Sequence, residues 1–268
     1  MKSIIRSLLG NKYMFFKDLF FLLSDRKNLT QIISPKEIPL IIINFNQLFY
    51  LQKLVDFAVK NNFKNIVIID NVSTYPPLLD YYKKIEHFVT IERMEKNYGH
   101  MVLFEVPQLL DKYCRNFFIL TDADIEPNAR LPSNFLKKLI FLLMKYHNKV
   151  LKVGFALEIK DIPLHYPARE KVLSWEKKYW TKEVEKDIYE AYIDTTFALY
   201  KPHPKKYMKF PQDFYKALRI GSDYTAKHGG WYINYDRLSD EQQYYVNLAN
   251  QSSSWVLDKE GTTKSKDY

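Results

Sequence analysis

Glycine and cysteine are scarce in this chain of 268 residues. Its seven glycines nowhere have the spacing of a G-x-G-x-x-G or G-x-x-x-x-G-K-S/T loop. Because such loops hold phosphates through backbone N–H groups, a Rossmann dinucleotide site and a P-loop are both disfavoured. A nucleotide would have to be held by side chains and ordinary loops. The single cysteine, Cys114, excludes a disulfide framework and a thiolate zinc site, and we expect it to be buried as a small hydrophobic residue.

Long apolar runs are missing as well, since none reaches the ~18–20 residues of a membrane-spanning helix. Hydrophobic residues still make up 47% of the chain and aromatic residues 16%. That is enough for a full core, so disorder is excluded for most of the chain. Lysine and arginine outnumber the acidic residues by 40 to 31, a net charge of +9 that suits phosphates, nucleic acid or an anionic membrane surface.

The N-terminal thirty residues differ from the rest because apolar residues recur there at helical spacing between basic ones. One interpretation is a basic amphipathic helix within residues 1–24 that lies on an anionic membrane surface, which would place the protein in the cytoplasm at the inner face of the membrane. The other is a first helix packed on the domain, or a leader. We divide the chain into this segment (1–30), a main domain (31–256) and a polar tail (257–268).

The main domain alternates short apolar runs with helical patterns up to about residue 160. This alternation predicts a mostly parallel central sheet with helices on both faces. Beyond that point the pattern is less regular and rich in Tyr, Trp, Pro and Lys. The predicted strands are 39–44, 65–70, 88–92, 116–121, 150–157 and 193–200.

Polar residues follow the predicted strands at the carboxyl ends, where open α/β sheets bind ligands. Asp122 and Asp124, just past the fourth strand, have the spacing to converge on one Mg²⁺ or Mn²⁺ ion, which would hold a diphosphate. The alternative is a solvated turn in which Asp124 caps the next segment. The other polar residues at these strand ends are Asn44, Asn46, Asp70, Asn71, Asn97 and Gly99.

The strand–helix–strand unit ending in Asp70-Asn71, followed by an Asp-x-Asp after a later strand, resembles a GT-A glycosyltransferase. The nearest broad group is the family 2-like bacterial enzymes. The resemblance covers about residues 37–256 and rests on the segments 68–79, 121–124, 152–155, 194–200 and 228–232. It implies a GT-A (Rossmann-like) fold with a nucleotide-sugar half (31–125) and a less regular acceptor half (126–256).

The resemblance also implies roles for the residues at the strand ends. Asp70 would contact the uridine of the donor, and Asn44 and Asn46 would line the nucleoside pocket. Asp122 would touch the ribose or a water on the metal, and Asp124 would bind the metal. The donor site would also include Asn71 and the turn of Asn97 and Gly99.

His228 lies in a turn with two glycines, between Lys227 and Trp231. Several GT-A enzymes complete the metal site with a C-terminal histidine, so the resemblance implies that His228 is a third ligand; the alternative is a structural histidine. Lys227 or Arg219 would neutralise the leaving diphosphate. Trp231 is the one aromatic residue that we assign to the sugar site.

The catalytic base is the least determined residue, since an inverting enzyme needs a carboxylate to take the acceptor's proton and a retaining one does not. Asp194 ranks first because it opens a predicted apolar strand, followed by Glu158 and then Asp223. Asp161 and Glu176 are further candidates.

Together these features predict a metal-dependent glycosyltransferase of the hexosyltransferase class. It would move a sugar from a UDP-sugar to a bacterial surface glycan or a lipid-linked acceptor in polysaccharide biosynthesis. A sugar-nucleotide nucleotidyltransferase is the alternative, but it usually has a glycine-rich basic loop where this chain has residues 44–47 without glycine or lysine. A nucleic-acid-binding module is disfavoured because the lysines are spread over the whole chain.

Overall fold

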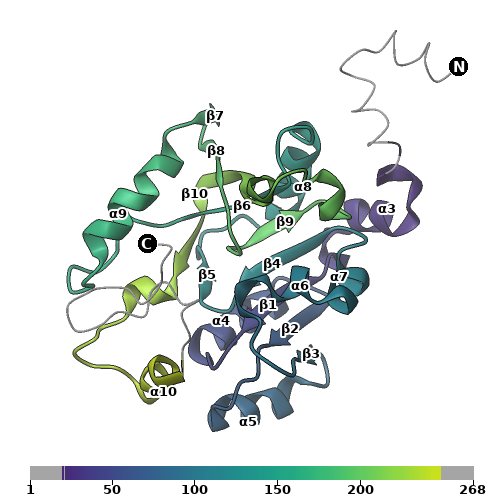
Figure 1. Cartoon of the computed structure of the whole chain (residues 1–268). Coiled ribbons are helices and arrows are strands. Elements are labelled where there is room, and N and C mark those ends of the chain that lie inside the picture. The colour runs from purple at the N-terminus through teal and green to yellow at the C-terminus, as the bar shows by residue number, and fades with distance from the viewer. Residues whose placement is uncertain (1–19, 21, 249–268) are drawn as a thin grey trace, which may run out of the picture.

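The structure is a computed structural model that describes residue 20 and residues 22–248 of the chain. In these residues ten strands form one mixed sheet with helices on both faces (Figure 1). This confirms the predicted α/β class with a mostly parallel central sheet. The boundaries predicted at residues 30 and 256 stay predictions, and most of the predicted amphipathic segment 1–24 lies outside the described residues.

The first half of the sheet is parallel, in the order β3-β2-β1-β4. The strands are short, β1, β2 and β4 are mostly apolar, and the residues along each strand alternate between the two faces. Ile42 and Ile68 belong to one core cluster, whereas Ile43 and Ile69 belong to the other. The bounds are β1 Leu40–Asn44, β2 Ile66–Asp70, β3 Thr90–Arg93 and β4 Phe118–Asp122.

The second half is mixed. The short strand β9 (Ala198–Tyr200) lies antiparallel between β4 and β6 (Lys152–Leu157). The prediction of one strand over 193–200 was therefore too long. The longest strand, β10 (Lys216–His228), pairs in parallel with β6. It was not predicted because polar residues interrupt its apolar ones, so the sequence shows no apolar run there. The remaining strands are β5 Ile125–Pro127, β7 Glu183–Glu185 and β8 Ile188–Tyr192.

The helices cover both faces of the sheet. One core cluster holds side chains of α4, α5 and α8, and the other holds those of α6 and α7 together with the buried Cys114. The single helix predicted over 101–112 is divided at Pro107, because Pro107 lacks an N–H group and keeps Val106 extended. The bounds are α3 Arg26–Ile33, α4 Phe49–Lys60, α5 Pro76–Ile85, α6 Val102–Glu105, α7 Pro107–Tyr113, α8 Phe135–Lys145, α9 Arg169–Lys177 and α10 Asp240–Leu248.

Helix α3 is anchored to the start of β4. The Gln31 side chain donates to the carbonyl of Phe117 (2.9 Å) and accepts from its N–H (3.0 Å). Asn116 donates to Asn28 at 3.0 Å. None of the helices in the described part of the chain is long and apolar enough to cross a membrane.

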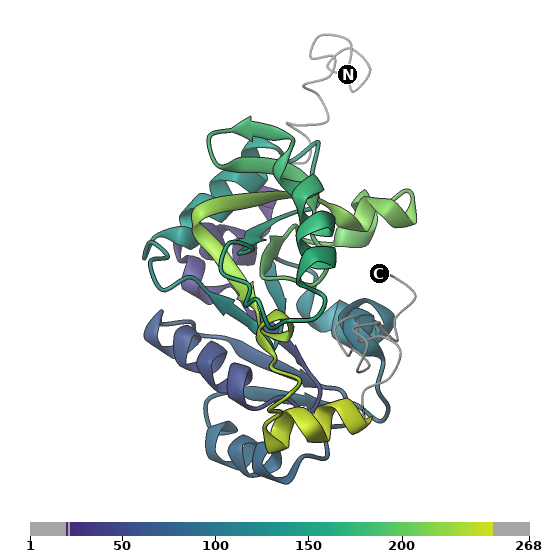
Figure 2. The same ribbon diagram turned by 90° about the vertical axis from the view of Figure 1, so that its left-hand side faces the viewer.

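Helix α10 closes over the loops that follow β1 and β2. The Glu241 carboxylate accepts from the backbone N–H groups of Leu48 (2.9 Å) and Phe49 (3.0 Å) at the start of α4, which has no side-chain cap of its own. The Tyr244 hydroxyl donates to Thr74 at 3.0 Å. Figure 2 shows α10, in yellow, beside the first half of the sheet and its helices. A carboxylate from the far end of the chain thus caps the helix after β1.

Replacement of Gly154 by Ala is expected to destabilise the sheet by about 1–3 kcal/mol through overpacking. A Cβ atom there would lie 2.4 Å from the carbonyl oxygen of Phe197 and 2.7 Å from the Cβ of Ala198, both on the segment that pairs with β6. Gly221→Ala is the matched control, since the nearest atom to a Cβ there would be in the Trp180 ring at 3.0 Å and the nearest backbone atom, the Asp187 oxygen, would be 3.6 Å away. Chemical denaturation should show the larger loss for Gly154→Ala; equal losses would contradict this account.

Candidate functional site

The carboxyl ends of β1 and β2 carry Asn44 and Asp70 side by side in register. The Tyr82 hydroxyl of α5 lies between them: it accepts from Asn44 at 2.9 Å and donates to Asp70 Oδ1 at 2.9 Å. Asp70 Oδ2 accepts from the N–H of Ser73 at 3.1 Å. All of these groups are buried, and in the described residues Asn44 Oδ1 has no hydrogen-bond partner. The network therefore holds Asp70 in one orientation and leaves a buried acceptor beside it.

Asn46 ties the loop after β1 to the loop after β2. Its backbone is left-handed (φ 51°), and its side-chain oxygen accepts from the N–H groups of Thr74 (2.7 Å) and Tyr75 (3.0 Å). Its own N–H donates to the Ser73 hydroxyl at 2.8 Å. Its amide nitrogen Nδ2 is buried with no hydrogen bond to any described residue.

Asn71 and Asn97 shape the turn after β3. Asn71 accepts from the N–H of Tyr98 at 3.2 Å and donates to the carbonyl of Gly99 at 3.0 Å. The Asn97 side chain accepts from the N–H of Gly99 at 2.8 Å, and Gly99 has a φ of 71° that favours glycine. These side chains hold the backbone of the turn at the same sheet edge.

Asp122 ends β4 and is bonded to the segment before β9. Its Oδ2 accepts from the Thr195 hydroxyl at 2.5 Å, and its N–H donates to the Thr195 carbonyl at 3.1 Å. Burial, together with the negative charge of Asp124, raises the pKa of the Asp122 carboxyl well above its usual value.

Asp124 and His228 are brought together by the pairing of β5 with β10. The N–H of Gly229 donates to the Asp124 carbonyl at 2.7 Å, and the Tyr50 ring packs so close to Gly229 that a Cβ there would lie 2.3 Å from it. The Asp124 carboxylate is buried, and its Oδ2 lies 3.6 Å from His228 Nδ1. In the described part of the chain neither atom has a hydrogen bond.

These two atoms suit a divalent cation. Two ligands that each lie about 2.1 Å from a metal are about 3 Å apart at right angles and at most about 4.2 Å apart, so the separation of 3.6 Å is compatible with a shared ion. Asp122 is not joined to them in one cluster: across residues 20 and 22–248, His, Cys, Asp and Glu form no group of three or more that could hold a metal ion. The ligand set of Asp122, Asp124 and His228 therefore stays a prediction.

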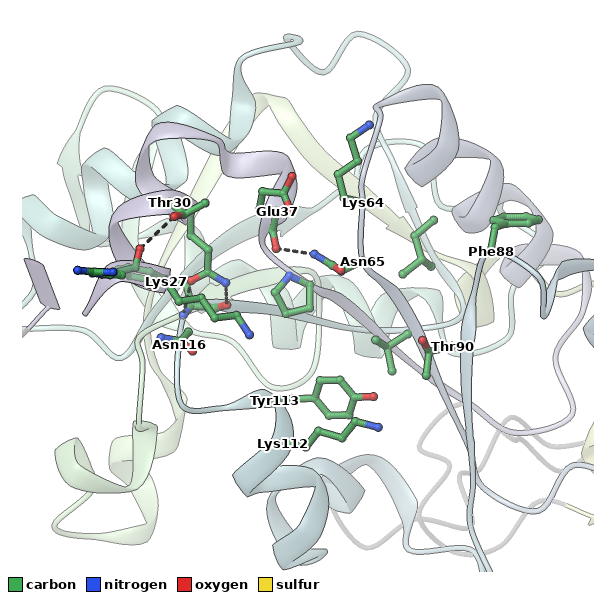
Figure 3. A pocket seen from close by; sticks show the side chains of 16 residues that line it. Lys27, Thr30, Glu37, Lys64, Asn65, Phe88, Thr90, Lys112, Tyr113 and Asn116 are labelled. Carbon is green, nitrogen blue, oxygen red and sulfur yellow. Dashed lines mark hydrogen bonds between the residues drawn. The ribbon is translucent and has the colours of Figure 1, made fainter. Parts of the chain in front are cut away.

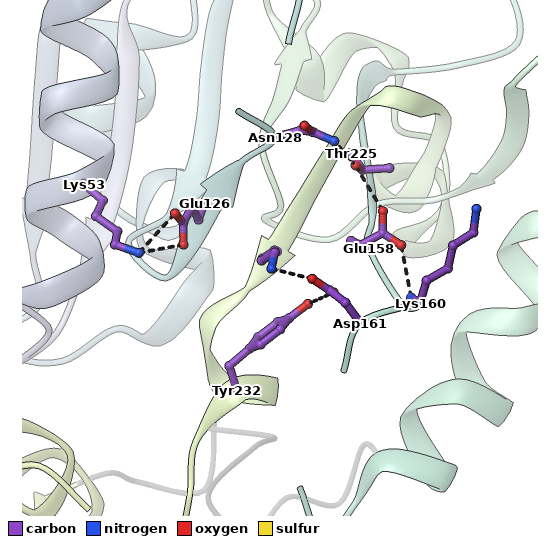
Figure 4. Close-up of polar contacts among 9 residues, drawn as sticks. Lys53, Glu126, Asn128, Glu158, Lys160, Asp161, Thr225 and Tyr232 are labelled. Atoms are coloured by element: carbon purple, nitrogen blue, oxygen red, sulfur yellow. Dashed lines mark hydrogen bonds and ion pairs between the residues drawn. The ribbon is translucent and has the colours of Figure 1, made fainter. Parts of the chain in front are cut away.

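A second polar group includes Asp161 and Tyr232, which Figure 4 shows joined by a hydrogen bond. Asp161 accepts from both Lys227 and the hydroxyl of Tyr232. Trp231 is only 3% exposed and stacks on the His228 ring with centroids 5.0 Å apart. Lys227 is thus paired with a carboxylate, and Trp231 supports the imidazole.

The three predicted base candidates differ in their surroundings. The Asp194 carboxylate is 51% exposed and lies 3.8 Å from His100 Nε2. It does not open a strand, since β9 begins at Ala198. Glu158 accepts from the N–H of Lys160 (3.0 Å), and Asp223 forms an exposed ion pair with Arg130 (3.1 Å).

Glu176, a further base candidate, and Arg219, which was expected to meet the diphosphate, are paired with each other. Glu176 is buried and accepts from Arg219 at 2.6 Å, so Arg219 is paired inside the protein. Arg219 also donates to the Tyr192 carbonyl at 2.7 Å.

Lys152 was missed by the sequence reasoning. Its fully buried Nζ donates to the Asp194 carbonyl (2.8 Å) and to the Tyr200 hydroxyl (2.8 Å), and it lies 3.7 Å from the centre of the Phe214 ring. Burial lowers the pKa of Lys152 well below its usual value. It holds the backbone of the segment that carries Asp194 and Thr195. Only its place at the start of an apolar run sets it apart in the sequence.

No protein-family model and no curated protein matches the sequence. Among solved structures it is similar to a mannosyltransferase from Pyrobaculum calidifontis in complex with GDP-Man and Mn²⁺, with 14% identity, a TM-score of 0.43 and coverage of 78% of this chain but only 60% of that one. A UDP-glucose pyrophosphorylase complexed with UDP-glucose has 13% identity and a TM-score of 0.34, covering 69% of this chain and 74% of that one. A 4-diphosphocytidyl-2C-methyl-D-erythritol synthase from Anaerococcus prevotii has 14% identity and a TM-score of 0.39, covering 81% and 98%. Likenesses this weak assign no activity to the chain, and membership of family 2 stays a prediction.

Replacement of Lys152 by Met is expected to remove a pH dependence of stability. Because the folded protein lowers the pKa of Lys152, the unfolded chain binds the extra proton between that lowered value and about 10.5. The free energy of unfolding of the wild type should therefore rise with pH up to about 10, relative to Lys152→Met. Denaturation at a series of pH values measures this, with the exposed Lys171→Met as control. A constant difference between Lys152→Met and wild type across the series would contradict it.

Proposed function

We propose that the protein is a metal-dependent glycosyltransferase that transfers a sugar from a nucleotide sugar, expected to be a UDP-sugar, to a bacterial glycan or lipid-linked acceptor. The observation that carries the proposal is the set of four buried polar atoms at one sheet edge that have no hydrogen bond within the described residues: Asn44 Oδ1, Asn46 Nδ2, Asp124 Oδ2 and His228 Nδ1. Leaving such atoms unpaired costs free energy that a ligand would recover.

The four atoms fall into two pairs with different chemistry. Asn44 and Asn46 offer an acceptor and a donor beside Asp70, which suits the edge of a nucleoside base. Asp124 and His228 offer an anionic oxygen and an imidazole nitrogen 3.6 Å apart, which suits Mn²⁺ or Mg²⁺. A nucleoside followed by a diphosphate on a cation is the donor half of a nucleotide sugar.

The chain's own residues would then divide the work as follows. Asp124 and His228 would hold the cation, which would neutralise charge on the leaving diphosphate. Trp231 would keep the imidazole plane fixed by stacking. Asp194 would accept the proton of the acceptor hydroxyl, since its carboxylate is half exposed while Lys152 and Tyr200 hold its carbonyl. Glu158 and Asp223 are the next candidates for this role.

The proposal predicts that Asp124→Asn and His228→Gln lose stabilisation by the donor. With Mn²⁺ present, a nucleotide sugar at 100 times its Kd should stabilise the wild type by about 2.7 kcal/mol, measured as a thermal shift. Both variants should lose that shift. Asp124→Asn should melt near the wild-type temperature without ligand, because the atom that it changes makes no hydrogen bond within the described residues, whereas His228→Gln also loses the stacking on Trp231. Asp236→Asn, an exposed carboxylate, is the control.

The reaction type is tested by the products. Release of the free nucleoside diphosphate from the donor in the presence of acceptor is expected. Formation of a nucleotide sugar from a sugar phosphate and a nucleoside triphosphate would instead assign a nucleotidyltransferase. A full Mn²⁺-dependent shift in Asp124→Asn would overturn the metal site.

A further inference from the structure

The edge of the sheet opposite the candidate site holds a groove of about 660 Å³. It lies at the amino ends of β1 to β4 and is lined on one side by α3 (Figure 3). Its volume is within the range of ligand sites in proteins. None of the residues assigned to the nucleotide or the metal lines it.

Positive charge dominates this groove. Four cationic side chains line it, Arg26, Lys27, Lys64 and Lys112, against the single carboxylate of Glu37. Lys112 is paired with Glu92 at 2.6 Å. Arg26, Lys27 and Lys64 have no side-chain hydrogen bond or ion pair with any described residue, so their charge is available to a partner.

An exposed apolar stripe borders the groove. On α3, Leu29 and Ile33 are one turn apart, with Arg26 at the start of the same face, and Ile33 is 77% exposed. Phe20, 74% exposed, precedes the helix. The opposite face of α3 is fixed to the domain through Asn28 and Gln31. The hydrogen bonds of Asn28 and Gln31 therefore keep the apolar stripe on the outer face of α3.

We propose that this edge docks on an anionic phospholipid bilayer, with lipid phosphates in the basic groove and Leu29, Ile33 and Phe20 in the interfacial layer. The combination of uncompensated cations with adjacent exposed apolar side chains is what such a surface takes up. A nucleic acid would use the cations and leave the apolar stripe in water.

Two other occupants have the wrong charge. Residues 1–19 carry Lys2, Arg6, Lys12 and Lys17 against Asp18 alone, so this segment is repelled by a cationic groove. A second copy of a chain with net charge +9 is repelled likewise.

The test is co-sedimentation of the full chain with vesicles, which needs no substrate and is independent of the proposed enzyme activity. Binding is expected to vesicles of phosphatidylcholine mixed with phosphatidylglycerol and to be weak with phosphatidylcholine alone. The double variants Lys27→Glu/Lys64→Glu and Leu29→Ser/Ile33→Ser should each bind about tenfold more weakly. All four positions are exposed, so both variants should keep the wild-type melting temperature.

Matched controls change the same residue types elsewhere. Lys171→Glu/Lys177→Glu removes the same charge from α9, and Leu164→Ser/Phe210→Ser removes two exposed apolar side chains. Both should bind like the wild type. The proposal is overturned if the controls lose as much binding as the groove variants. It is also overturned if only replacement of Lys2, Arg6, Lys12 and Lys17 by Ser abolishes binding, or if the chain binds single-stranded nucleic acid through Lys27 and Lys64 but no vesicle.

Discussion

The parallel strands β1, β2 and β4 end side by side, so Asn44, Asp70 and Asp122 all have to be accommodated at one buried edge. Each of these side chains requires a partner because unpaired polar groups are costly away from water. The fold supplies Tyr82 from α5 for the first two and Thr195 from the segment before β9 for the third. The loops follow from these bonds, since Asn46 and Ser73 are placed by the same network. The hydrogen bonds made by the polar side chains at the strand ends thus fix the positions of the buried atoms that remain without a hydrogen-bond partner.

The basic side chains at the two edges of the sheet also differ in whether they are paired with carboxylates. At the carboxyl edge the basic side chains expected to meet a diphosphate are already paired: Lys227 with Asp161 and Arg219 with Glu176. Arg26, Lys27 and Lys64, which line the groove at the amino edge, have no side-chain hydrogen bond or ion pair with any described residue. The two edges of one sheet have different chemistry, one with buried acceptors and the other with exposed cations.

The sequence was sufficient for the elements whose signal is local. The apolar runs of β1, β2 and β4 predicted those strands closely, and the strand-end residues followed from the sheet class. Strand β10 was missed because its residues do not form an apolar run, and its parallel partner β6 is more than 60 residues away in the sequence. Lys152 and Glu241 were missed for the same reason: their roles depend on Asp194 and on the N-terminus of α4, which only the folded chain brings near. That Asp124 and His228 lie close together could be expected only from the family resemblance, since β5 and β10 are far apart in the sequence.

The position of β9 has a consequence for how the chain assembles. Strand β4 ends at residue 122, yet its neighbour on that side is formed by residues 198–200, so the edge of β4 stays open until nearly 80 later residues have been made. During synthesis the parallel half can form on its own, with an apolar strand edge exposed to other chains. Strand β6, although it comes earlier, joins the sheet only through β9 and β10. The closing of this gap is a non-local step, which makes it the expected slow step of folding and the stage at which nascent chains are most prone to aggregate.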